Sequence, residues 1–525
     1  MKIISIIFIF SLFSVYYSNK TFEEESEDVI LSTSFEDGDI SMFSKRGEWD
    51  SAILSLEKDG GKTGSNYLWI SGRQANWNGV QIGLDDKCNQ GIEYTVSVSL
   101  KSKQNSNICL SMQYSYLDEI HYANLFCTVN QGEWVDMKEY KFTMPLGCKN
   151  VFLYFEITNG QDDFGIDDFL LKVAPSYTIQ EDIPSLKDIY KNYFKFGTAT
   201  NAGEAPTQQL IFKHFNSITI GNELKPDYLL DYKATLENAE KTGDYTNVKV
   251  KIGLAGPILE FCAENNIPLR GHTFVWHSQT PTWFFKEKYD KDGEWVSKET
   301  MIKRMENYIK NVFEMIKSQF PNNEFYAWDV VNEAWKNDGT PRNGGSTQEN
   351  PENSPWVKIF GDNSFIKYAF QFAKKYGIEG CKYFYNDYNE YIEGKKNAIV
   401  NMVKEINAGE QLIDGIGMQS HLDVNYPPVD LYESAIKAFS ELGVEVQVTE
   451  LDVTTSDNSD LSFEKQAKYY SDIMDVILKY SEHVTAVVVW GTTDDKSWRA
   501  KQYPLLFNYD YTAKPCFYSI VDGLE

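Results

Sequence analysis

The chain has 525 residues, of which 42% are hydrophobic and 15% aromatic, and its formal net charge is −26. This composition is typical of globular proteins with packed cores, and the length allows roughly two to four domains. The negative charge repels phosphate backbones and anionic lipid surfaces, so nucleic acids and membranes are not expected partners. The 12 Trp, 33 Tyr and 32 Phe suit a ligand with apolar ring faces and hydroxyl groups.

The N-terminus carries an apolar run from Ile3 to about Val15, preceded by Lys2. The run is too short to span a bilayer comfortably and fits a secretory signal peptide over residues 1–18. A membrane anchor or a buried strand is the alternative. Because no second apolar run of roughly 18 or more residues follows, we expect a soluble mature protein that is secreted to the extracellular space.

Seven cysteines leave at least one thiol unpaired. Four lie in the N-terminal part of the chain, at Cys88, Cys109, Cys127 and Cys148, and three lie further on, at Cys262, Cys381 and Cys516. We expect disulfides among the first four, with buried free thiols as the alternative, and the pairing cannot be read from the sequence. No pair has the C-x-x-C spacing of a metal site, so no metal is expected.

Strict alternation of apolar and polar residues marks the first folded region. Residues 92–100, IEYTVSVSL, place five apolar side chains on one face: Ile92, Tyr94, Val96, Val98 and Leu100. The same pattern recurs at residues 108–114 and 151–157, with Gly, Asn and Asp between the runs. No helical period interrupts it, so we expect an all-β sandwich, antiparallel and jelly-roll-like, over residues 30–173.

The pattern changes after a short linker, residues 174–186, which contains two prolines. Short apolar runs now alternate with amphipathic segments such as residues 298–320, which indicates a β/α architecture. The candidate strands are residues 194–200, 217–222, 269–277, 325–333, 382–389, 415–422, 444–451 and 485–491. Eight strands in about 340 residues predict a (β/α)8 TIM barrel over residues 187–525.

Two acidic residues stand at the ends of predicted barrel strands, where the active face of this fold lies. Glu333 closes the fourth candidate strand and Glu450 nearly closes the seventh. Cleavage of a glycosidic bond needs two such carboxyls, one to protonate the leaving oxygen and one to attack or to activate water. If both side chains face the same mouth of the barrel, ionised Glu450 would raise the pKa of Glu333 and keep Glu333 protonated. The alternative is that each is an ordinary strand-end salt-bridge partner.

Other polar and aromatic residues follow the same strand ends. They are Asn222, Glu223 and Lys225 after the second strand, His272, Trp276, His277 and Gln279 at the third, Gln419 and His421 at the sixth, and Trp490 and Trp498 after the eighth. Donors and acceptors beside tryptophan faces are suited to binding a pyranose. We interpret His277 as a structural residue.

Between Phe194 and Tyr518, seven motifs resemble those of glycoside hydrolase family 10, the endo-β-1,4-xylanases, and follow one another in the order found in that family. They are NELKPD, GHTFVWHSQTPTWF, WDVVNEAW, YNDYN, GMQSHL, TELDV and WGTTDDKSW. The resemblance implies a retaining enzyme that hydrolyses internal bonds of xylan and xylo-oligosaccharides by double displacement and needs no cofactor. It makes Glu333 the general acid/base and Glu450 the nucleophile, with carboxyls ~5 to 5.5 Å apart.

The resemblance also implies roles for the neighbouring residues. Asn332 would bind the 2-hydroxyl of the sugar in subsite −1, and Gln419 and His272 would complete that subsite. His421 would orient Glu450, with Asp452 behind it. Substrate contacts further along the cleft would be Asn222, Glu223, Lys225, Trp276, Gln279 and Trp490, and Trp498 would crowd the place where glucose carries its hydroxymethyl group.

The N-terminal region resembles a family 22 carbohydrate-binding module, through SGRQANWNGVQIGL, GEWVDM and FGIDDFLL. Residues that align with ligand contacts of that family are Arg46, Trp77, Tyr122 and Glu156. The alternative is that these aromatic residues are core and that the module only stabilises the barrel. Binding of xylan, other glucans or calcium stays open.

Two rival interpretations remain at this point. A cellulase of another barrel family would also carry an Asn-Glu pair on strand four and a Glu on strand seven, but NELKPD and GHTFVWHSQ argue against it. A catalytically inactive polysaccharide-binding protein would need a defect that the sequence does not show. We expect a monomer.

Overall fold

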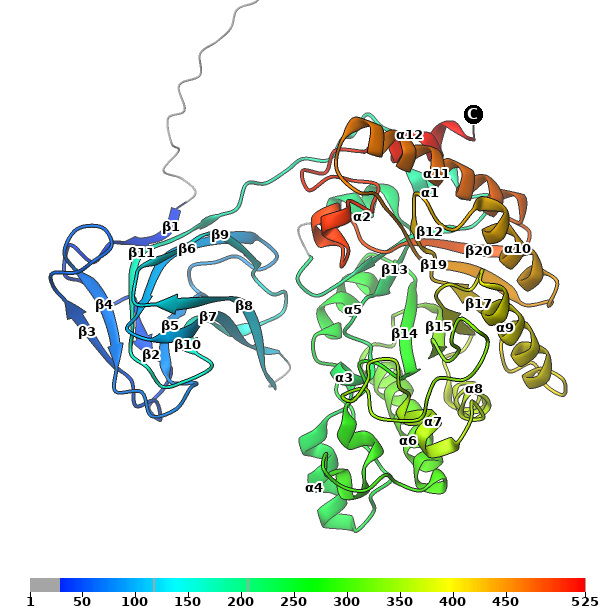
Figure 1. Ribbon diagram of the computed structural model, residues 1–525, viewed down its shortest axis with the longest axis horizontal. Coiled ribbons are helices and arrows are strands. Elements are labelled where there is room, and N and C mark those ends of the chain that lie inside the picture. The colour runs from blue at the N-terminus through cyan, green and yellow to red at the C-terminus, as the bar shows by residue number, and fades with distance from the viewer. Residues whose placement is uncertain (1–28, 117–118, 205–206, 525) are drawn as a thin grey trace, which may run out of the picture.

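The computed structural model describes residues 29–116, 119–204 and 207–524. It contains two domains side by side, joined by the irregular segment 174–185 (Figure 1). The signal peptide expected over residues 1–18 lies outside the described residues. In the described ranges, no helix is long and apolar enough to span a membrane.

The first domain is an antiparallel β-sandwich, as predicted. One sheet has the order β3-β4-β11-β6-β9 with β1 paired to β11, and the other has the order β2-β5-β10-β7-β8. The strands are β1 (Val29–Thr33), β2 (Ser44–Lys45), β3 (Ile53–Glu57), β4 (Tyr67–Ser71), β5 (Gly79–Gly83), β6 (Glu93–Ser102), β7 (Asn105–Tyr116), β8 (Glu119–Gln131), β9 (Val135–Thr143), β10 (Lys149–Ile157) and β11 (Phe164–Val173).

Alternation along β6 buries the apolar face that the sequence predicts, with one exception. Val96, Val98 and Leu100 are buried in the sandwich core. The prediction for Ile92 is wrong, since its side chain is 41% exposed. Ile92 precedes β6, in a turn where its amide donates to the carbonyl of Asn89 at 3.4 Å, so the strand alternation does not yet apply.

One disulfide joins neighbouring strands of the second sheet, between Cys109 of β7 and Cys127 of β8. Cys88 and Cys148 are buried free thiols, as are the three cysteines of the barrel. Of the first four cysteines, two therefore form a disulfide and two are buried free thiols, so each of the two alternatives holds for one pair.

The second domain is a closed barrel of eight parallel strands, which confirms the predicted TIM fold. Its strands are β12 (Lys195–Thr200), β13 (Ser217–Ile220), β14 (Leu269–Trp276), β15 (Phe325–Asn332), β16 (Lys382–Asp387), β17 (Gly415–Met418), β19 (Glu445–Thr454) and β20 (Val484–Val489). Neighbours along the chain pair in order, and the pairs β17–β19 and β12–β20 close the ring.

Helices surround this barrel. They are α1 (Leu186–Ile189), α2 (Gln208–His214), α3 (Pro226–Leu229), α4 (Tyr232–Thr242), α5 (Ala255–Glu264), α6 (Lys298–Gln319), α7 (Pro355–Phe360), α8 (Phe365–Tyr376), α9 (Glu393–Ile406), α10 (Val429–Ser440), α11 (Asp460–Lys479) and α12 (Pro515–Asp522), with short 3-10 turns η2 (Thr282–Phe285), η3 (Glu287–Tyr289), η4 (Asp494–Lys496) and η5 (Ala500–Gln502). Helix α6 matches the predicted amphipathic segment, and Ser297 caps it by accepting the Thr300 amide at 3.2 Å.

The sixth predicted strand is interrupted. Strand β17 ends at Met418, and a separate short strand, β18 (His421–Asp423), pairs with β19. Ser420 lies between them with φ 59°, a left-handed conformation that no regular strand adopts. The break turns the chain at the mouth of the barrel, where Gln419 and His421 are placed.

A buried ion pair fixes the strands beneath the mouth. Arg270 of β14 donates to both carboxylate oxygens of Asp329 of β15, at 2.7 and 3.0 Å, and its Nε donates to Gln447 of β19 at 2.7 Å. Asp329 also lies 3.0 Å from Nδ1 of His272. Because a buried charge needs this full set of partners, the contacts hold three strands and one imidazole ring in a fixed arrangement.

Candidate active site

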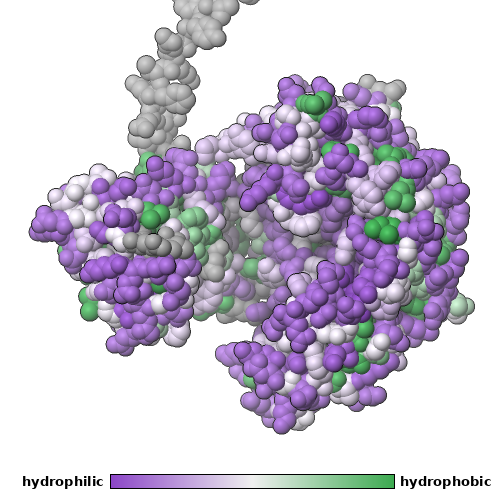
Figure 2. Space-filling model, in the orientation of Figure 1, coloured by the Kyte–Doolittle hydropathy of each residue, from purple (hydrophilic) through white to green (hydrophobic). Residues whose placement is uncertain are grey.

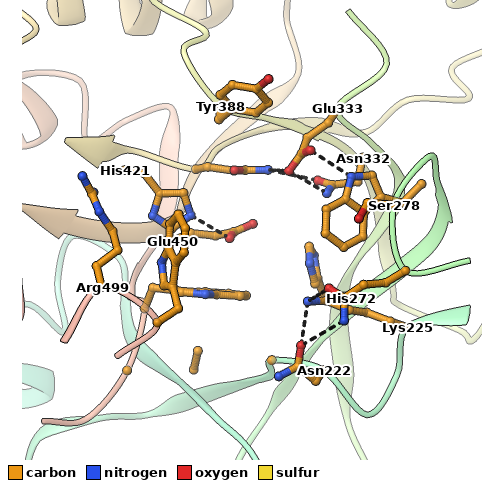
Figure 3. Close-up of a pocket in the computed structure, with 18 of the residues that line it drawn as sticks. Asn222, Lys225, His272, Ser278, Asn332, Glu333, Tyr388, His421, Glu450 and Arg499 are labelled. Carbon is orange, nitrogen blue, oxygen red and sulfur yellow. Dashed lines mark hydrogen bonds and ion pairs between the residues drawn. The ribbon is translucent and has the colours of Figure 1, made fainter. Parts of the chain in front are cut away.

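A cleft of about 810 Å³ opens at the C-terminal ends of the barrel strands (Figure 3). Most of the site residues predicted from the sequence line it: Asn222, Lys225, His272, Trp276, Gln279, Asn332, Glu333, Gln419, His421, Glu450, Trp490 and Trp498. His277, which we interpret as a structural residue, also lines the cleft. Glu333 and Glu450 point into the same cavity. Glu223 and Asp452 are the two predicted barrel residues that do not line it.

Glu333 reaches the cleft because its backbone leaves the strand conformation. Successive residues of a strand point to opposite faces, but Glu333 has φ 57°, so both Asn332 and Glu333 line the cleft. A non-glycine residue in this region is strained by roughly 1 to 2 kcal/mol. The Asn332 amide donates to Glu333 Oε1 at 3.1 Å, which joins the two side chains.

The surroundings of Glu333 favour its protonated form. Its Oε1 accepts from Gln419 at 2.9 Å and its Oε2 accepts from the Trp276 indole at 2.8 Å. Burial is the main cause that raises the pKa of Glu333, and the Asp387 and Glu450 carboxylates raise it further against these two hydrogen bonds. The predicted effect of Glu450 is therefore present, but it is smaller than the effect of burial.

The surroundings of Glu450 favour its ionised form. Its Oε1 accepts from the Asn386 amide at 2.8 Å, and its Oε2 lies 3.1 Å from Nε2 of His421. Burial alone would raise the pKa of Glu450, but the His421 hydrogen bond, the nearby His272 and His421 rings and the Asn386 amide together outweigh it, so the pKa lies below its ordinary value. The pKa values of the two glutamates are thus shifted in opposite directions although both side chains are buried.

His421 is held in turn by Asp452, whose Oδ2 lies 2.9 Å from Nδ1 of the imidazole. Burial would lower the pKa of His421, but Asp452 and Glu450 raise it to about 10, so the ring is a cation that donates through both nitrogens. Asp452 also accepts from Arg499 at 2.6 Å and from the Trp498 indole at 3.2 Å. Trp498 is 68% exposed, and its ring packs edge-on against the His421 ring with centres 5.1 Å apart.

Asn386 is a site residue that the sequence reasoning missed. It is fully buried at the end of β16, and its Nδ2 donates to Asn332 Oδ1 at 2.9 Å as well as to Glu450. Thr449 fixes its orientation by donating to Oδ1 at 2.6 Å. Its position at the end of the fifth candidate strand, within YNDYN, is the signal that could have identified it.

One end of the cleft carries the Lys225 cluster. Lys225 Nζ donates to Asn222 Oδ1 and Gln279 Oε1, each at 2.9 Å, and lies 5.1 Å from the centre of the Trp276 ring. Glu223 is oriented differently from the prediction: its Oε1 accepts the backbone amide of Ala202 at 2.8 Å. Its side chain is buried and supports the neighbouring loop of the barrel.

The opposite end contains three further residues that the sequence reasoning missed. Arg342 donates to the backbone carbonyl of Glu333 at 2.6 Å, to Glu352 at 2.7 Å and to the Tyr388 hydroxyl at 3.2 Å. Arg342 and Glu352 belong to the long loop after β15. No strand periodicity marks a loop of this kind, so only the structure places these residues in the cleft.

The predicted carbohydrate contacts of the sandwich lie together. Arg46 donates to Glu156 at 3.0 Å and to the Trp77 carbonyl at 2.9 Å, and its guanidinium stacks on Tyr154 at 3.7 Å. The Trp77 and Tyr122 side chains are 55% and 60% exposed. Tyr122 packs edge-on against Tyr154 with ring centres 6.5 Å apart. Tyr122, Tyr154 and Glu156 therefore lie on one face of the second sheet, and Arg46 connects them to the loop before β5 that carries Trp77.

Within the described ranges, no cluster of three or more His, Cys, Asp or Glu side chains could hold a metal ion.

Comparison with known families identifies both domains. The family model described as glycosyl hydrolase family 10 matches residues 185–523, and one described as a carbohydrate binding domain matches residues 27–162. The chain belongs to glycosyl hydrolase family 10. Its sandwich is a carbohydrate-binding module close to family 22, as its motifs predict.

One relative of this chain is a protein of Acetivibrio thermocellus named endo-1,4-beta-xylanase Y. The two sequences are 37% identical over 496 residues, and the match covers 90% of this chain and 45% of the relative. A bifunctional endo-1,4-beta-xylanase of Ruminococcus flavefaciens is 45% identical over 336 residues, or 63% of this chain and 33% of the relative. This chain therefore spans less than half the length of either relative.

A solved structure also spans both domains. It contains the CBM22-1 and GH10 modules of the N-terminal endo-1,4-beta-D-xylanase 10B of Clostridium thermocellum, complexed with xylohexaose. It is 33% identical to this chain, with a TM-score of 0.62, and the match covers 95% of this chain and 98% of that one.

Asn386→Ala tests how the charge of Glu450 is set. Loss of the amide removes a hydrogen bond that stabilises the carboxylate, so the pKa of Glu450 rises. A carboxylate that attacks a glycosidic bond must be ionised, so with Glu450 in that role we expect the acidic limb of kcat/KM against pH to move to higher pH, by about one unit. The profile is measured with an aryl glycoside, and the exposed Asn425→Ala variant is the control that keeps the parent profile. An acidic limb that stays in place in Asn386→Ala contradicts this account.

Proposed function

We propose that the protein is a retaining endo-1,4-β-xylanase that hydrolyses internal β-1,4-xylosidic bonds of xylan. The observation that carries the proposal is the pair of buried glutamates in one cleft, one with a raised and one with a lowered pKa. Glycoside hydrolysis with retention needs this pair, an acid that is protonated and a nucleophile that is ionised. The motifs and the names of the relatives support the choice of xylan.

In the first step of the proposed reaction, Glu450 attacks the anomeric carbon while Glu333 gives its proton to the leaving oxygen. The bond to the leaving sugar breaks, and a glycosyl ester to Glu450 forms. In the second step Glu333, now ionised, takes a proton from water, whose oxygen attacks the anomeric carbon and releases Glu450. Asn386 and His421 hold the nucleophile in place, and Trp276 and Gln419 hold the acid.

Endo action is supported by the shape of the cleft. It extends to both sides of the acid pair, toward Asn222 and Lys225 on one side and toward Tyr388 on the other (Figure 3), where Arg342 is hydrogen-bonded to the Tyr388 hydroxyl. A polysaccharide can therefore lie through the site with its chain continuing at both ends. Trp498, held against Asp452, supports a preference for xylose, because its ring leaves less room for the hydroxymethyl group of glucose.

We assign the sandwich a supporting function, binding of xylan through Trp77, Tyr122, Arg46 and Glu156. The apolar run near the N-terminus supports export to the extracellular space. We also propose that the enzyme acts as a monomer.

Glu450→Ala tests the catalytic assignment. We expect the variant to stay folded and to lose activity on xylan by about four orders of magnitude or more, because the covalent step has no substitute. Glu464→Ala, an exposed glutamate of α11, is the matched control and keeps the parent rate. Reducing-sugar release is measured on xylan and on carboxymethylcellulose.

Three results of that assay would contradict the proposal. A Glu450→Ala variant as active as the parent would reject the nucleophile. Higher parent activity on carboxymethylcellulose than on xylan would favour a cellulase. A parent that binds xylan but releases no sugar would establish an inactive binding protein.

Trp77→Ala tests the sandwich. Loss of an exposed aromatic anchor lowers affinity for insoluble xylan by about tenfold or more, as measured by depletion from solution. Ile53→Ala, an equally exposed apolar residue of the other sheet, is the control and binds like the parent. If insoluble xylan retains the Trp77→Ala variant as well as it retains the parent, xylan binding through Trp77 is rejected, and the module only stabilises the barrel.

A further inference from the structure

A second cavity, of about 450 Å³, lies where the two domains meet. The molecular surface is hollowed between the domains (Figure 2). Three parts of the chain form this interdomain cavity: the sandwich contributes Glu93 and Lys141, the linker contributes Tyr177, and the barrel contributes Lys496, Tyr509 and Tyr511. Its volume falls within the range of ~300 to 1,000 Å³ that is usual for ligand sites.

Tyrosine rings form one side of the interdomain cavity. Tyr177 packs edge-on against Tyr509, with ring centres 5.7 Å apart, and against Tyr511, with ring centres 5.9 Å apart. Tyr509 lies in a short turn closed by pairing of Phe507 with Ala513, and its side chain is 59% exposed. An exposed tyrosine that its neighbours hold in place offers an apolar ring face with a polar edge at a low entropy cost on binding.

The interdomain cavity borders the catalytic cleft. Lys496 lines both of them. A chain of hydrogen bonds connects the Lys225 cluster with this border: Asn222 donates to Asn201 at 3.0 Å, and Asn201 donates to Glu204 at 2.8 Å. That chain of hydrogen bonds ends at Glu204, and Glu204 and Lys496 both line the cleft. The cleft therefore leads toward the interdomain cavity from its Asn222 end.

Charges in the interdomain cavity are already paired. Glu93 accepts from Lys496 at 2.9 Å through Oε1 and from Lys141 at 3.0 Å through Oε2. Asp495 lies 3.6 Å from the same Lys496 ammonium. Both lysines are balanced by carboxylates, so an anionic ligand would have to displace a partner. Aromatic faces with balanced polar groups suit a neutral, hydroxylated chain instead.

We propose that the interdomain cavity is a distal binding site for xylan, which takes neutral β-1,4-linked xylosyl residues of the chain that leaves the cleft at its Asn222 end. The inference rests on the proposed function, because the same chain must first occupy the cleft. Tyr509 supplies the ring on which a xylosyl residue stacks, and Tyr177 holds that ring in place. Because residues of both domains form the site, it exists only where the two domains meet. Only substrates long enough to reach it from the cleft bind more tightly through it.

The test compares a substrate confined to the cleft with one that reaches the interdomain cavity. In Tyr509→Ala, kcat/KM on long xylo-oligosaccharides and xylan falls about three- to tenfold, the usual effect of one aromatic stacking contact. On an aryl β-xylobioside, which is too short to reach the cavity, kcat/KM keeps its parent value. Tyr509→Phe retains the ring and keeps parent activity on both substrates. Tyr193→Ala, a 43% exposed tyrosine outside both cavities, is the matched control.

The possible outcomes separate this inference from the proposed function. An active parent whose Tyr509→Ala variant is unchanged on long substrates overturns the distal site and leaves the xylanase assignment intact. An equal loss on both substrates also overturns it, because the effect would then be general damage to the barrel. A parent inactive on both substrates rejects the proposed function, and the distal site with it.

Discussion

The amide of Asn386 is the contact on which the geometry of the active site depends. A single nitrogen at the end of β16 donates both to Asn332 of β15 and to Glu450 of β19. Asn332 in turn donates to Glu333, so hydrogen bonds connect the two acids across the barrel mouth. This arrangement exists only because the sheet closes through β17 and β19, which brings the ends of these strands around one cavity.

Burial alone would not distinguish the two glutamates, because it raises the pKa of both. The difference comes from their partners. Glu450 faces an imidazolium whose charge is maintained by Asp452, and Asp452 is itself neutralised by Arg499. Glu333 faces neutral donors, the Trp276 indole and the Gln419 amide, with carboxylates nearby. A cation on one side and neutral groups on the other thus shift the two pKa values in opposite directions within one cleft, as the proposed roles of nucleophile and acid require.

Much of the fold could be predicted because it follows from periodicity. Alternation with a period of two gave the sandwich, and eight apolar runs separated by amphipathic segments gave the barrel. The break at Ser420 could not be predicted, since a serine with positive φ has no sequence signal. The exposure of Ile92 and the pairing of Cys109 with Cys127 depend on where strands begin and how they align, which alternation does not determine.

The site was predicted as far as strand ends and motifs could define it. Glu333, Glu450 and the residues around them follow from their position after apolar runs. The orientation of Glu223 depends on a single amide of a neighbouring loop, and Arg342 belongs to a loop without periodicity, so neither could be inferred. The contact between the domains, through pairs such as Glu93 and Lys496, joins positions far apart in the chain and leaves no local pattern.

The central claim is that Glu450 forms a covalent bond to the sugar while Glu333 manages the proton. The most direct measurement is the anomeric configuration of the newly released reducing end, followed by proton NMR during xylan hydrolysis before mutarotation equilibrates the anomers. Two displacements at the anomeric carbon predict that the β-anomer appears first. Initial release of the α-anomer would show a single displacement by water and would contradict the account.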